Sequence, residues 1–270
     1  MNNHPICNTC GTQFLGEKQL NELCPICNDD RQFVPEEGQS WTNLDELKRK
    51  HTVKITQFTD SLYSLTVTPG FAIGQRAFLI LSPHGNILWD CIPLLDEPTI
   101  DFIKSKGGLK AIALSHPHFY STMNEWAAVF DCPIYIHQND SEFIFNRGPH
   151  VQLWGGDSEQ LWDGIKLVNI GGHFPGSSIL HIASLSPGGS IFCGDTFYLA
   201  PSKRFIAVMY SYPNRIMLAK KEFLSVYKKS SDLEFDTFHG ASFEGQSLFG
   251  NANDVFTASM KNYMERYEIQ

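Results

Sequence analysis

The residues best suited to metal chemistry lie in the string Leu114–Ser121, which contains His116 and His118 separated by one residue. The string follows Leu109–Leu114, an apolar run that predicts a short buried strand. Two histidines at a strand end can reach one metal ion, because a bend in the loop lets alternate side chains converge. A pair of this kind is weak evidence for a metal site when it stands by itself.

Three later segments place further metal-binding residue types beside glycine, each after an expected strand. They contain His173 within Gly171–Ser177, Asp195 beside Gly194, and His239 beside Gly240. Histidine and aspartate on loops that follow strands are what a loop-built metal site requires. Together with the histidine pair, these segments predict a metal centre.

A second set of metal-binding residues lies near the N-terminus, where four of the seven cysteines form two closely spaced pairs. Two residues separate the cysteines within each pair, a spacing that suits a tetrahedral Zn²⁺ site. Disulfides would need an oxidising compartment, which nothing in the sequence supports. The other three cysteines are isolated in apolar stretches and are expected to be small buried groups. The sequence therefore predicts structural Zn²⁺ bound by Cys7, Cys10, Cys24 and Cys27.

The chain divides by composition into three parts. Residues 1–35, which we call the cysteine module, are too few to bury a useful core and need their metal to fold. Residues 36–51 are expected to be a linker and a short helix over Asn43–Lys50, with Thr42 as its N-cap. Residues 52–270 form the main domain.

The order of expected elements in the main domain favours an α+β sandwich. Alternating apolar residues between positions 52 and 90 predict strands joined by hairpins. Helices and strands then alternate, and strands return around a hairpin signal at Asp163–Gly164. Two last helices are expected at Arg215–Lys229 and Asp254–Tyr267. This order indicates sheets packed between helices and not a Rossmann sheet.

In this order and rough spacing, the motifs HxH, GGHFPGS, GDT and a late HG resemble those of the metallo-β-lactamase-fold hydrolase superfamily. The strand Ile87–Asp90 is similar to that family's early strand ending in aspartate. The resemblance covers about residues 52–270 and implies an αββα sandwich with metals at one edge. The cysteine module lies outside this core and is an addition to it.

Carried over position by position, the resemblance implies a role for each motif residue. His116, His118 and His173 match the family's three-histidine first metal site. Asp195 matches the bridging carboxylate, and His239 matches the last histidine of the second site.

The chain departs from the family's HxHxDH motif at two positions. Tyr120 stands where the second-site aspartate belongs, and Ser121 stands where a histidine belongs. A neutral phenol and a serine hydroxyl are poor Zn²⁺ ligands, so we expect one metal ion at this site. Asp195 and Tyr120 are then the expected catalytic residues, with the phenol near the open metal face to polarise a carbonyl oxygen. Asp90 is expected to brace the HxH loop by hydrogen bonds and not to bind metal.

These features predict a metal-dependent hydrolase of a small ester, thioester or lactone, using a single metal-bound hydroxide, because Zn²⁺ lowers the pKa of bound water to about 7. Two alternatives stay open. One is a weakly catalytic or non-catalytic metal-binding scaffold that docks a partner. The other is a mononuclear Fe²⁺ enzyme similar to persulfide dioxygenases, in which Asp195 would complete a face of two histidines and one carboxylate.

Composition narrows the class of partner. The net charge of −8 argues against bulk binding of nucleic acid or anionic membranes. The cysteine module carries four acidic and two basic side chains, which favours a role in stability or docking. Apolar runs fall far short of the roughly 20 residues that span a bilayer, and no secretory signal is visible, so we expect a cytoplasmic protein with a small-molecule substrate. The segment Met209–Asn214 either walls the pocket or caps a helix.

Overall fold

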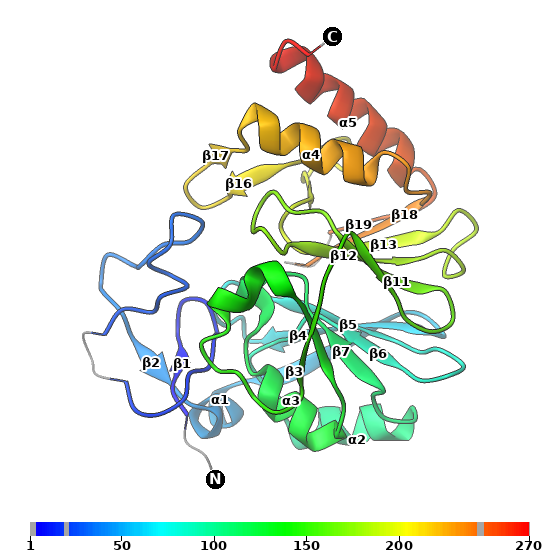
Figure 1. Ribbon diagram of the computed structural model, residues 1–270. Coiled ribbons are helices and arrows are strands. Elements are labelled where there is room, and N and C mark those ends of the chain that lie inside the picture. The colour runs from blue at the N-terminus through cyan, green and yellow to red at the C-terminus, as the bar shows by residue number, and fades with distance from the viewer. Residues whose placement is uncertain (1–3, 19–21, 242–245, 270) are drawn as a thin grey trace.

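Two β-sheets lie face to face and are covered on their outer sides by helices, as the computed structural model shows for residues 4–18, 22–241 and 246–269 (Figure 1). The seven-stranded sheet consists, in spatial order, of β3 (Thr52–Thr59), β4 (Leu62–Thr68), β5 (Arg76–Ile80), β6 (Ile87–Trp89), β7 (Ala111–Ala113), β8 (Ile134–His137) and β9 (Val151–Trp154). The six-stranded sheet consists of β10 (Ser158–Gln160), β11 (Ile165–Asn169), β12 (Ser178–Ile182), β13 (Ser190–Cys193), β18 (Thr237–Gly240) and β19 (Ser247–Leu248).

Helices form the two outer layers. Figure 1 shows two of them on the outer side of the seven-stranded sheet, α2 (Glu97–Ser105) and α3 (Met123–Phe130). On the outer side of the other sheet lie α4 (Lys220–Ser230) and α5 (Ala252–Arg266). The predicted αββα sandwich is therefore confirmed. None of the helices in the described ranges is long and apolar enough to cross a membrane.

The two-residue period of the strands sorts their side chains between layers. In β5, Phe78 and Ile80 pack in the cluster between the two sheets, whereas Ala77 and Leu79 pack in the cluster beneath α2 and α3. In β13, Phe192 likewise faces the other sheet. Apolar burial on both faces fixes the register of these strands, because a slip of one residue would exchange their faces. The strand ends that carry the candidate site are thereby held in place.

Some boundaries differ from those expected from the sequence. Helix α4 begins at Lys220 and not at Arg215, because Ile216 pairs with Ser211 in a small hairpin between β16 (Met209–Ser211) and β17 (Ile216–Met217). Arg215 has a φ of +57° in the turn of this hairpin. Helix α1 (Leu44–Lys50) has Asn43 as its N-cap in place of Thr42, and the Asn43 side chain accepts a hydrogen bond from the Glu46 N–H.

The cysteine module is fastened to the main domain and to the linker. Its strand β1 (Ile6–Cys7) pairs with β2 (Trp41–Thr42). The Gln13 N–H donates to the Ser121 carbonyl at 3.1 Å, and Ser121 Oγ donates to the Gly11 carbonyl at 3.3 Å. Gly11 has a φ of +75°, and a Cβ there would lie 3.1 Å from Pro93. The module thus fits closely against the loop that follows His118.

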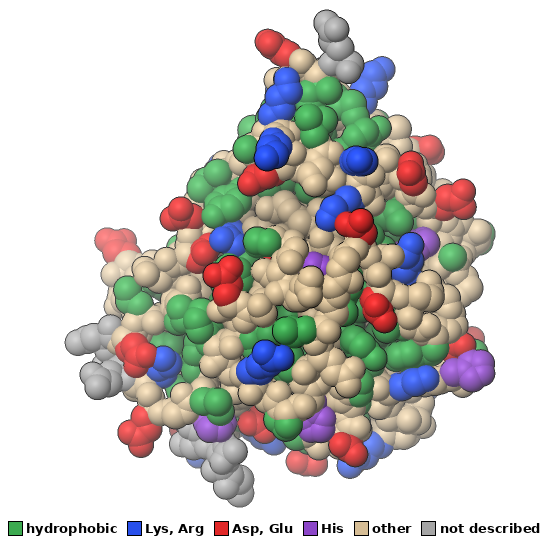
Figure 2. All heavy atoms as spheres, viewed as in Figure 1, with side chains coloured by type: hydrophobic (Ala, Val, Ile, Leu, Met, Phe, Trp, Pro, Cys, Tyr) green, Lys and Arg blue, Asp and Glu red, His purple; other side chains and the backbone are tan. Residues whose placement is uncertain are grey.

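The surface carries both signs of charge. Figure 2 shows Asp and Glu side chains interspersed with Lys and Arg over the described part of one face. Mixed charge of this kind is typical of an ordinary solvated surface.

Changing Cys24 to Ser should remove one of the four thiols of the module and with it about one metal ion per chain, because structural zinc supplies roughly 10 kcal/mol or more to such modules. The main domain should keep a cooperative unfolding transition, since it has its own hydrophobic clusters. Elemental analysis and calorimetry check both statements. Cys132→Ser is the control, because this buried thiol lies outside the module and should leave the metal content unchanged. Loss of the cooperative transition in Cys24→Ser alone would show that the main domain depends on the module to fold.

Candidate metal centre

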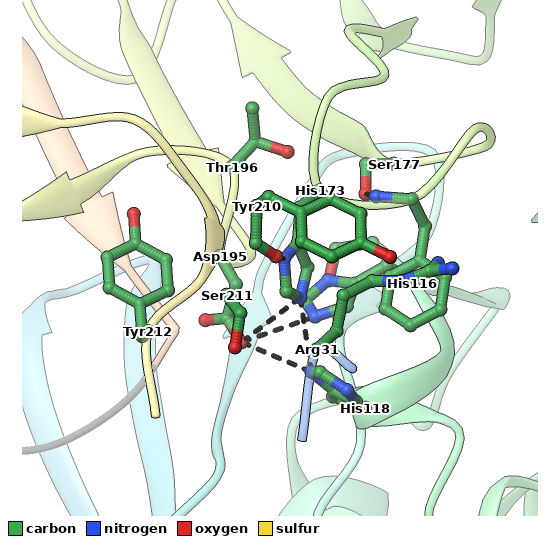
Figure 3. A network of polar contacts seen from close by, with 12 residues as sticks. Arg31, His116, His118, His173, Ser177, Asp195, Thr196, Tyr210, Ser211 and Tyr212 are labelled. Atoms are coloured by element: carbon green, nitrogen blue, oxygen red, sulfur yellow. Dashed lines mark hydrogen bonds and ion pairs between the residues drawn. The ribbon is translucent and has the colours of Figure 1, made fainter. Parts of the chain in front are cut away.

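Four of the five predicted ligands meet at one edge of the sandwich. His116 follows β7 and directly precedes a short 3₁₀ turn, η1 (Pro117–Phe119), which contains His118. His173 lies in the loop between β11 and β12, and Asp195 follows β13. Figure 3 shows the three imidazoles and the carboxylate pointing toward one another. The group therefore draws on both sheets.

The spacing of the donor atoms fits a metal ion. Asp195 Oδ2 lies 3.3 Å from His116 Nε2, 3.5 Å from His118 Nδ1 and 4.0 Å from His173 Nε2. His173 Nε2 lies 3.2 Å from His118 Nδ1. Ligands about 2.0–2.1 Å from a tetrahedral Zn²⁺ ion would be roughly 3.3 Å apart. The buried His116 Nε2 atom also makes no hydrogen bond within the described residues. The four side chains thus suit a divalent metal.

Neighbouring groups orient the imidazoles. His173 Nδ1 lies 2.6 Å from the Tyr210 carbonyl, which can only accept, so Nδ1 carries the proton and Nε2 has a free lone pair. Ser115 Oγ lies 2.9 Å from His116 Nδ1. Gly194 permits the close approach of this pair to β13, because a Cβ there would lie 2.5 Å from both atoms.

Burial sets the protonation of the site. It lowers the pKa of His116 to about 4 and holds the pKa of His173 well below its ordinary value. Burial also acts to raise the pKa of Asp195, but its close polar contacts with His116 and His118 outweigh this effect and keep that pKa below its ordinary value. Neutral histidine and ionised aspartate are the forms that bind metal.

Asp90 contacts the loop that carries the histidine pair. Its Oδ1 accepts a hydrogen bond of 2.7 Å from the Ser115 N–H, next to His116. The carboxyl is fully buried, and burial raises its pKa well above the ordinary value. Asp90 is not among the four grouped donors, and its contact is of the bracing kind expected from the sequence.

His239, the fifth predicted ligand, is not brought to this group. Its Nδ1 lies 2.9 Å from Ser247 Oγ, and its ring stacks on Phe192 with 4.7 Å between ring centroids. Phe58 and Phe78 pack around the same ring. Because β18 directs the side chain between the sheets, His239 is part of an aromatic cluster in this structure.

Tyr120 does not face the metal centre, which corrects its expected position. Its ring packs in the cluster beneath α2 and α3, beside Met123 and Trp126. Its hydroxyl is buried and has no hydrogen-bond partner among the described residues. The 3₁₀ turn over Pro117–Phe119 rotates the chain after His118, so the side chain at position 120 points into the core. Ser121 contacts the cysteine module instead of the metal centre.

A cavity of about 480 Å³ opens onto the donors. His118, His173 and Asp195 form its floor, while Tyr198 and Tyr212 form part of its wall. The segment Met209–Asn214 therefore does contribute to the pocket, through Tyr212 and Pro213. The cysteine module also lines the cavity, through three consecutive residues, Arg31, Gln32 and Phe33. Sequence reasoning missed these three, since no local signal links the module to the pocket.

The four cysteines form a second donor group. Cys7 Sγ lies 3.6 Å from Cys27 Sγ, and Cys10 Sγ lies 3.6 Å from Cys24 Sγ. Sulfurs bound at about 2.3 Å to a tetrahedral Zn²⁺ ion would be about 3.8 Å apart. Gln39 Nε2 donates to Cys7 Sγ at 3.1 Å, a contact that favours a thiolate. The predicted four-cysteine cluster is present, and its geometry fits a structural metal.

Comparison with known sequences finds a relative of similar extent. No protein-family model matches the chain. The chain is 40% identical over 239 residues to the uncharacterized protein YmaE of Bacillus subtilis (strain 168), which covers 87% of each protein.

Solved structures match the fold at low identity. A crystal structure of DIM-1 metallo-β-lactamase has a TM-score of 0.57 and 13% identity, covering 81% of this chain and 99% of that one. The FIM-1 metallo-β-lactamase from Pseudomonas aeruginosa in its mono-zinc form has a TM-score of 0.54 and 12% identity, covering 78% and 96%. A B3 metallo-β-lactamase with an active-site glutamic acid has a TM-score of 0.53 and 13% identity, covering 93% and 97%. The fold is that of the metallo-β-lactamases.

The purified protein should hold two metal ions per chain, one in each donor group. His173→Ala should remove the ion of the histidine site, because it deletes one of four converging donors. His239→Phe should keep both ions, since an aromatic ring suits the cluster around position 239. Elemental analysis of each variant after gel filtration measures the difference. Loss of an ion from His239→Phe would make His239 a ligand.

Asp140, beside the His173 loop, should make stability depend on pH. Burial raises its pKa to about 7, and its Oδ1 accepts a hydrogen bond of 2.6 Å from the Gly176 N–H. Between about pH 4 and pH 7 the unfolded chain ionises this carboxyl while the folded chain does not, so the free energy of unfolding falls as pH rises. Asp140→Asn removes this titration.

The Asp140→Asn variant should therefore be more stable than the parent protein at pH 8, by on the order of 2–4 kcal/mol. The difference should shrink as the pH is lowered toward 4. Urea unfolding of both proteins at pH 5, 6.5 and 8 measures it. An advantage that does not change with pH would mean that Asp140 is already ionised in the folded protein across this range.

Proposed function

This chain belongs to the family of Bacillus subtilis YmaE and has the metallo-β-lactamase fold, and from that premise we propose that it is a metal-dependent hydrolase of small ester, thioester or lactone substrates. The observation that carries the proposal is the convergence of three imidazoles and one carboxylate on a single point beneath a cavity. We propose Zn²⁺ for this site and structural Zn²⁺ for the cysteine module. The mono-zinc form of FIM-1 is a structure of the same fold with zinc.

A single ion suits this site better than two. In the described part of the chain, the grouped donors are His116, His118, His173 and Asp195. Tyr120 and Ser121 point to the core and to the cysteine module, and His239 lies among aromatic rings. The positions that would hold a second ion are therefore used for packing. The three-histidine set also suits zinc hydrolysis better than the two-histidine face that an iron oxygenase needs.

A divalent ion held by these residues supplies Lewis acidity and lowers the pKa of water toward 7, which gives a nucleophile for a carbonyl carbon at neutral pH. The protein supplies the rest. Asp195 adds a negative charge beside the three buried imidazoles, which favours a divalent cation, and the Tyr210 carbonyl holds His173 in one tautomer. Tyr212, fixed by a hydrogen bond of 3.2 Å to the Ala207 carbonyl, gives the substrate a rigid aromatic wall. Apolar wall residues such as Phe33 and Ile73 limit the access of water to the bound substrate.

The test is a screen of the zinc-loaded protein against aryl esters, acyl thioesters and lactones. We expect hydrolysis of at least one class, with loss of the rate in His173→Ala. Leu224→Ser is a matched control, because this exposed residue lies on α4, outside the cavity. A fully loaded protein that hydrolyses none of the three classes would favour the alternative of a metal-binding scaffold.

Tyr120→Phe should leave kcat/KM within about twofold of the parent value, because the phenol hydroxyl does not line the cavity. It should also raise the free energy of unfolding by about 1 kcal/mol, since it removes a buried hydroxyl without a partner. Tyr212→Ala should instead lower kcat/KM about tenfold, because it opens the aromatic wall. Steady-state kinetics and urea unfolding separate the two variants. A large loss of rate in Tyr120→Phe would restore the phenol as a catalytic group.

A further inference from the structure

Arg31 is held rigidly on the turn that follows the last cysteine of the module. Asp29 Oδ1 accepts a hydrogen bond of 2.9 Å from the Arg31 N–H and also lies 2.9 Å from Arg31 Nε. Asn214 Nδ2 donates to the carbonyls of Asp30 at 2.8 Å and Gln32 at 3.0 Å. The turn is thus tied to the loop that walls the metal cavity.

The guanidinium of Arg31 lies beside the metal centre. Its central carbon is 3.9 Å from the centroid of the Phe174 ring, and Phe174 directly follows His173. Tyr210, whose carbonyl orients His173, has its ring 5.2 Å from the same carbon. Figure 3 shows Arg31 next to His116 and His118. Contact with aromatic faces fixes the plane of the guanidinium.

Arg31 places a largely buried positive charge in the lining of the metal cavity. Among the described residues that line the cavity, Arg31 is the one Lys or Arg. Its side chain is only 13% exposed, and Asp29 lies on its Nε edge. Its Nη1 atom is buried and makes no hydrogen bond within the described residues. Burying a guanidinium is costly unless its donors are paired, so packing alone would be served better by an apolar side chain.

We propose that Arg31 binds a carboxylate on the substrate, so that the cysteine module is a substrate-binding element of the active site. This inference rests on the proposed function, because it assigns the substrate class of that same site. A guanidinium recognises a carboxylate through charge-assisted hydrogen bonds, which give orientation as well as affinity. Apolar and aromatic side chains line the same cavity as Arg31 and Asp195, and such a lining suits a short acyl chain. The substrate is therefore an ester or thioester whose acyl chain ends in a carboxylate.

Two matched pairs of compounds test the inference. The esters are 4-nitrophenyl hydrogen glutarate, with a terminal carboxylate, and the neutral 4-nitrophenyl butyrate. The anilides of the same two acids resist hydrolysis and report binding alone, by calorimetric titration of the zinc-loaded protein. We expect the parent protein to favour the carboxylate member of each pair.

Arg31→Gln should lower kcat/KM for the glutarate ester, and affinity for the glutarate anilide, by about 10- to 100-fold. It should change the values for the butyrate compounds by less than about threefold. Arg31→Lys keeps the charge but loses the planar fork, so it should restore part of the preference. Lys18→Gln is the matched control, because it removes a cation from the same module that does not line the metal cavity. Metal content and melting temperature are measured for each variant.

The outcomes separate the two proposals. The role of Arg31 would be overturned if the parent protein showed equal kcat/KM for the two esters and equal affinity for the two anilides. A preference for the carboxylate compound that survives in Arg31→Gln would also overturn it. A merely structural role predicts that Arg31→Gln and Arg31→Lys weaken both members of a pair alike, which would also overturn it. If no variant hydrolyses either ester but the anilides still show an Arg31-dependent preference, the proposed hydrolysis fails while the carboxylate site stands.

Discussion

The structure depends on four donor groups that are taken out of water at one point between the two sheets. Burial keeps His116 and His173 neutral at physiological pH, and the contacts with histidine keep Asp195 ionised. The donor atoms lie 3.2–4.0 Å apart around a common centre, a spacing at which one cation could contact all four. Burying polar groups so close together is unfavourable, and the rest of the main domain is the framework that holds them in place.

The two residues that depart from the HxHxDH motif, Tyr120 and Ser121, have separate structural roles. In the related HxHxDH motif this segment supplies ligands for a second ion, whereas here Tyr120 fills the core and Ser121 exchanges hydrogen bonds with the cysteine module. Gln75 Nε2 adds a further link, since it donates to the His118 carbonyl at 3.1 Å and the Cys10 carbonyl at 2.6 Å. The loop that carries the ligand His118 is therefore also the surface on which the cysteine module packs. The two residues that depart from the motif therefore pack the core and contact the module.

Much of the framework could be predicted because its signals are local. The buried strand expected within Leu109–Leu114 is present as β7, and HxH, His173 and Asp195 converge because each follows a strand. The direction of a side chain after a tight turn is not a local signal, which explains the misplacement of Tyr120. The contact between Arg31 and Phe174 joins distant parts of the chain, so neither composition nor local spacing predicts it. The same holds for α4, whose start was obscured by a hairpin that pairs Ile216 with Ser211.

The cysteine cluster and the histidine site are connected by contacts between the turn that follows Cys27 and the loop that carries His173. The cysteines fix the fold of the module, and the turn beyond Cys27 is fixed by Asp29 and by Asn214. From that turn, the Arg31 side chain packs on the ring of Phe174, which directly follows the ligand His173. If the four cysteines bind structural Zn²⁺, as proposed, that metal fixes the conformation of so small a module and with it the position of Arg31 relative to the metal centre. On the proposal that Arg31 binds a substrate carboxylate, the metal of the cysteine module would thus set the position of that carboxylate.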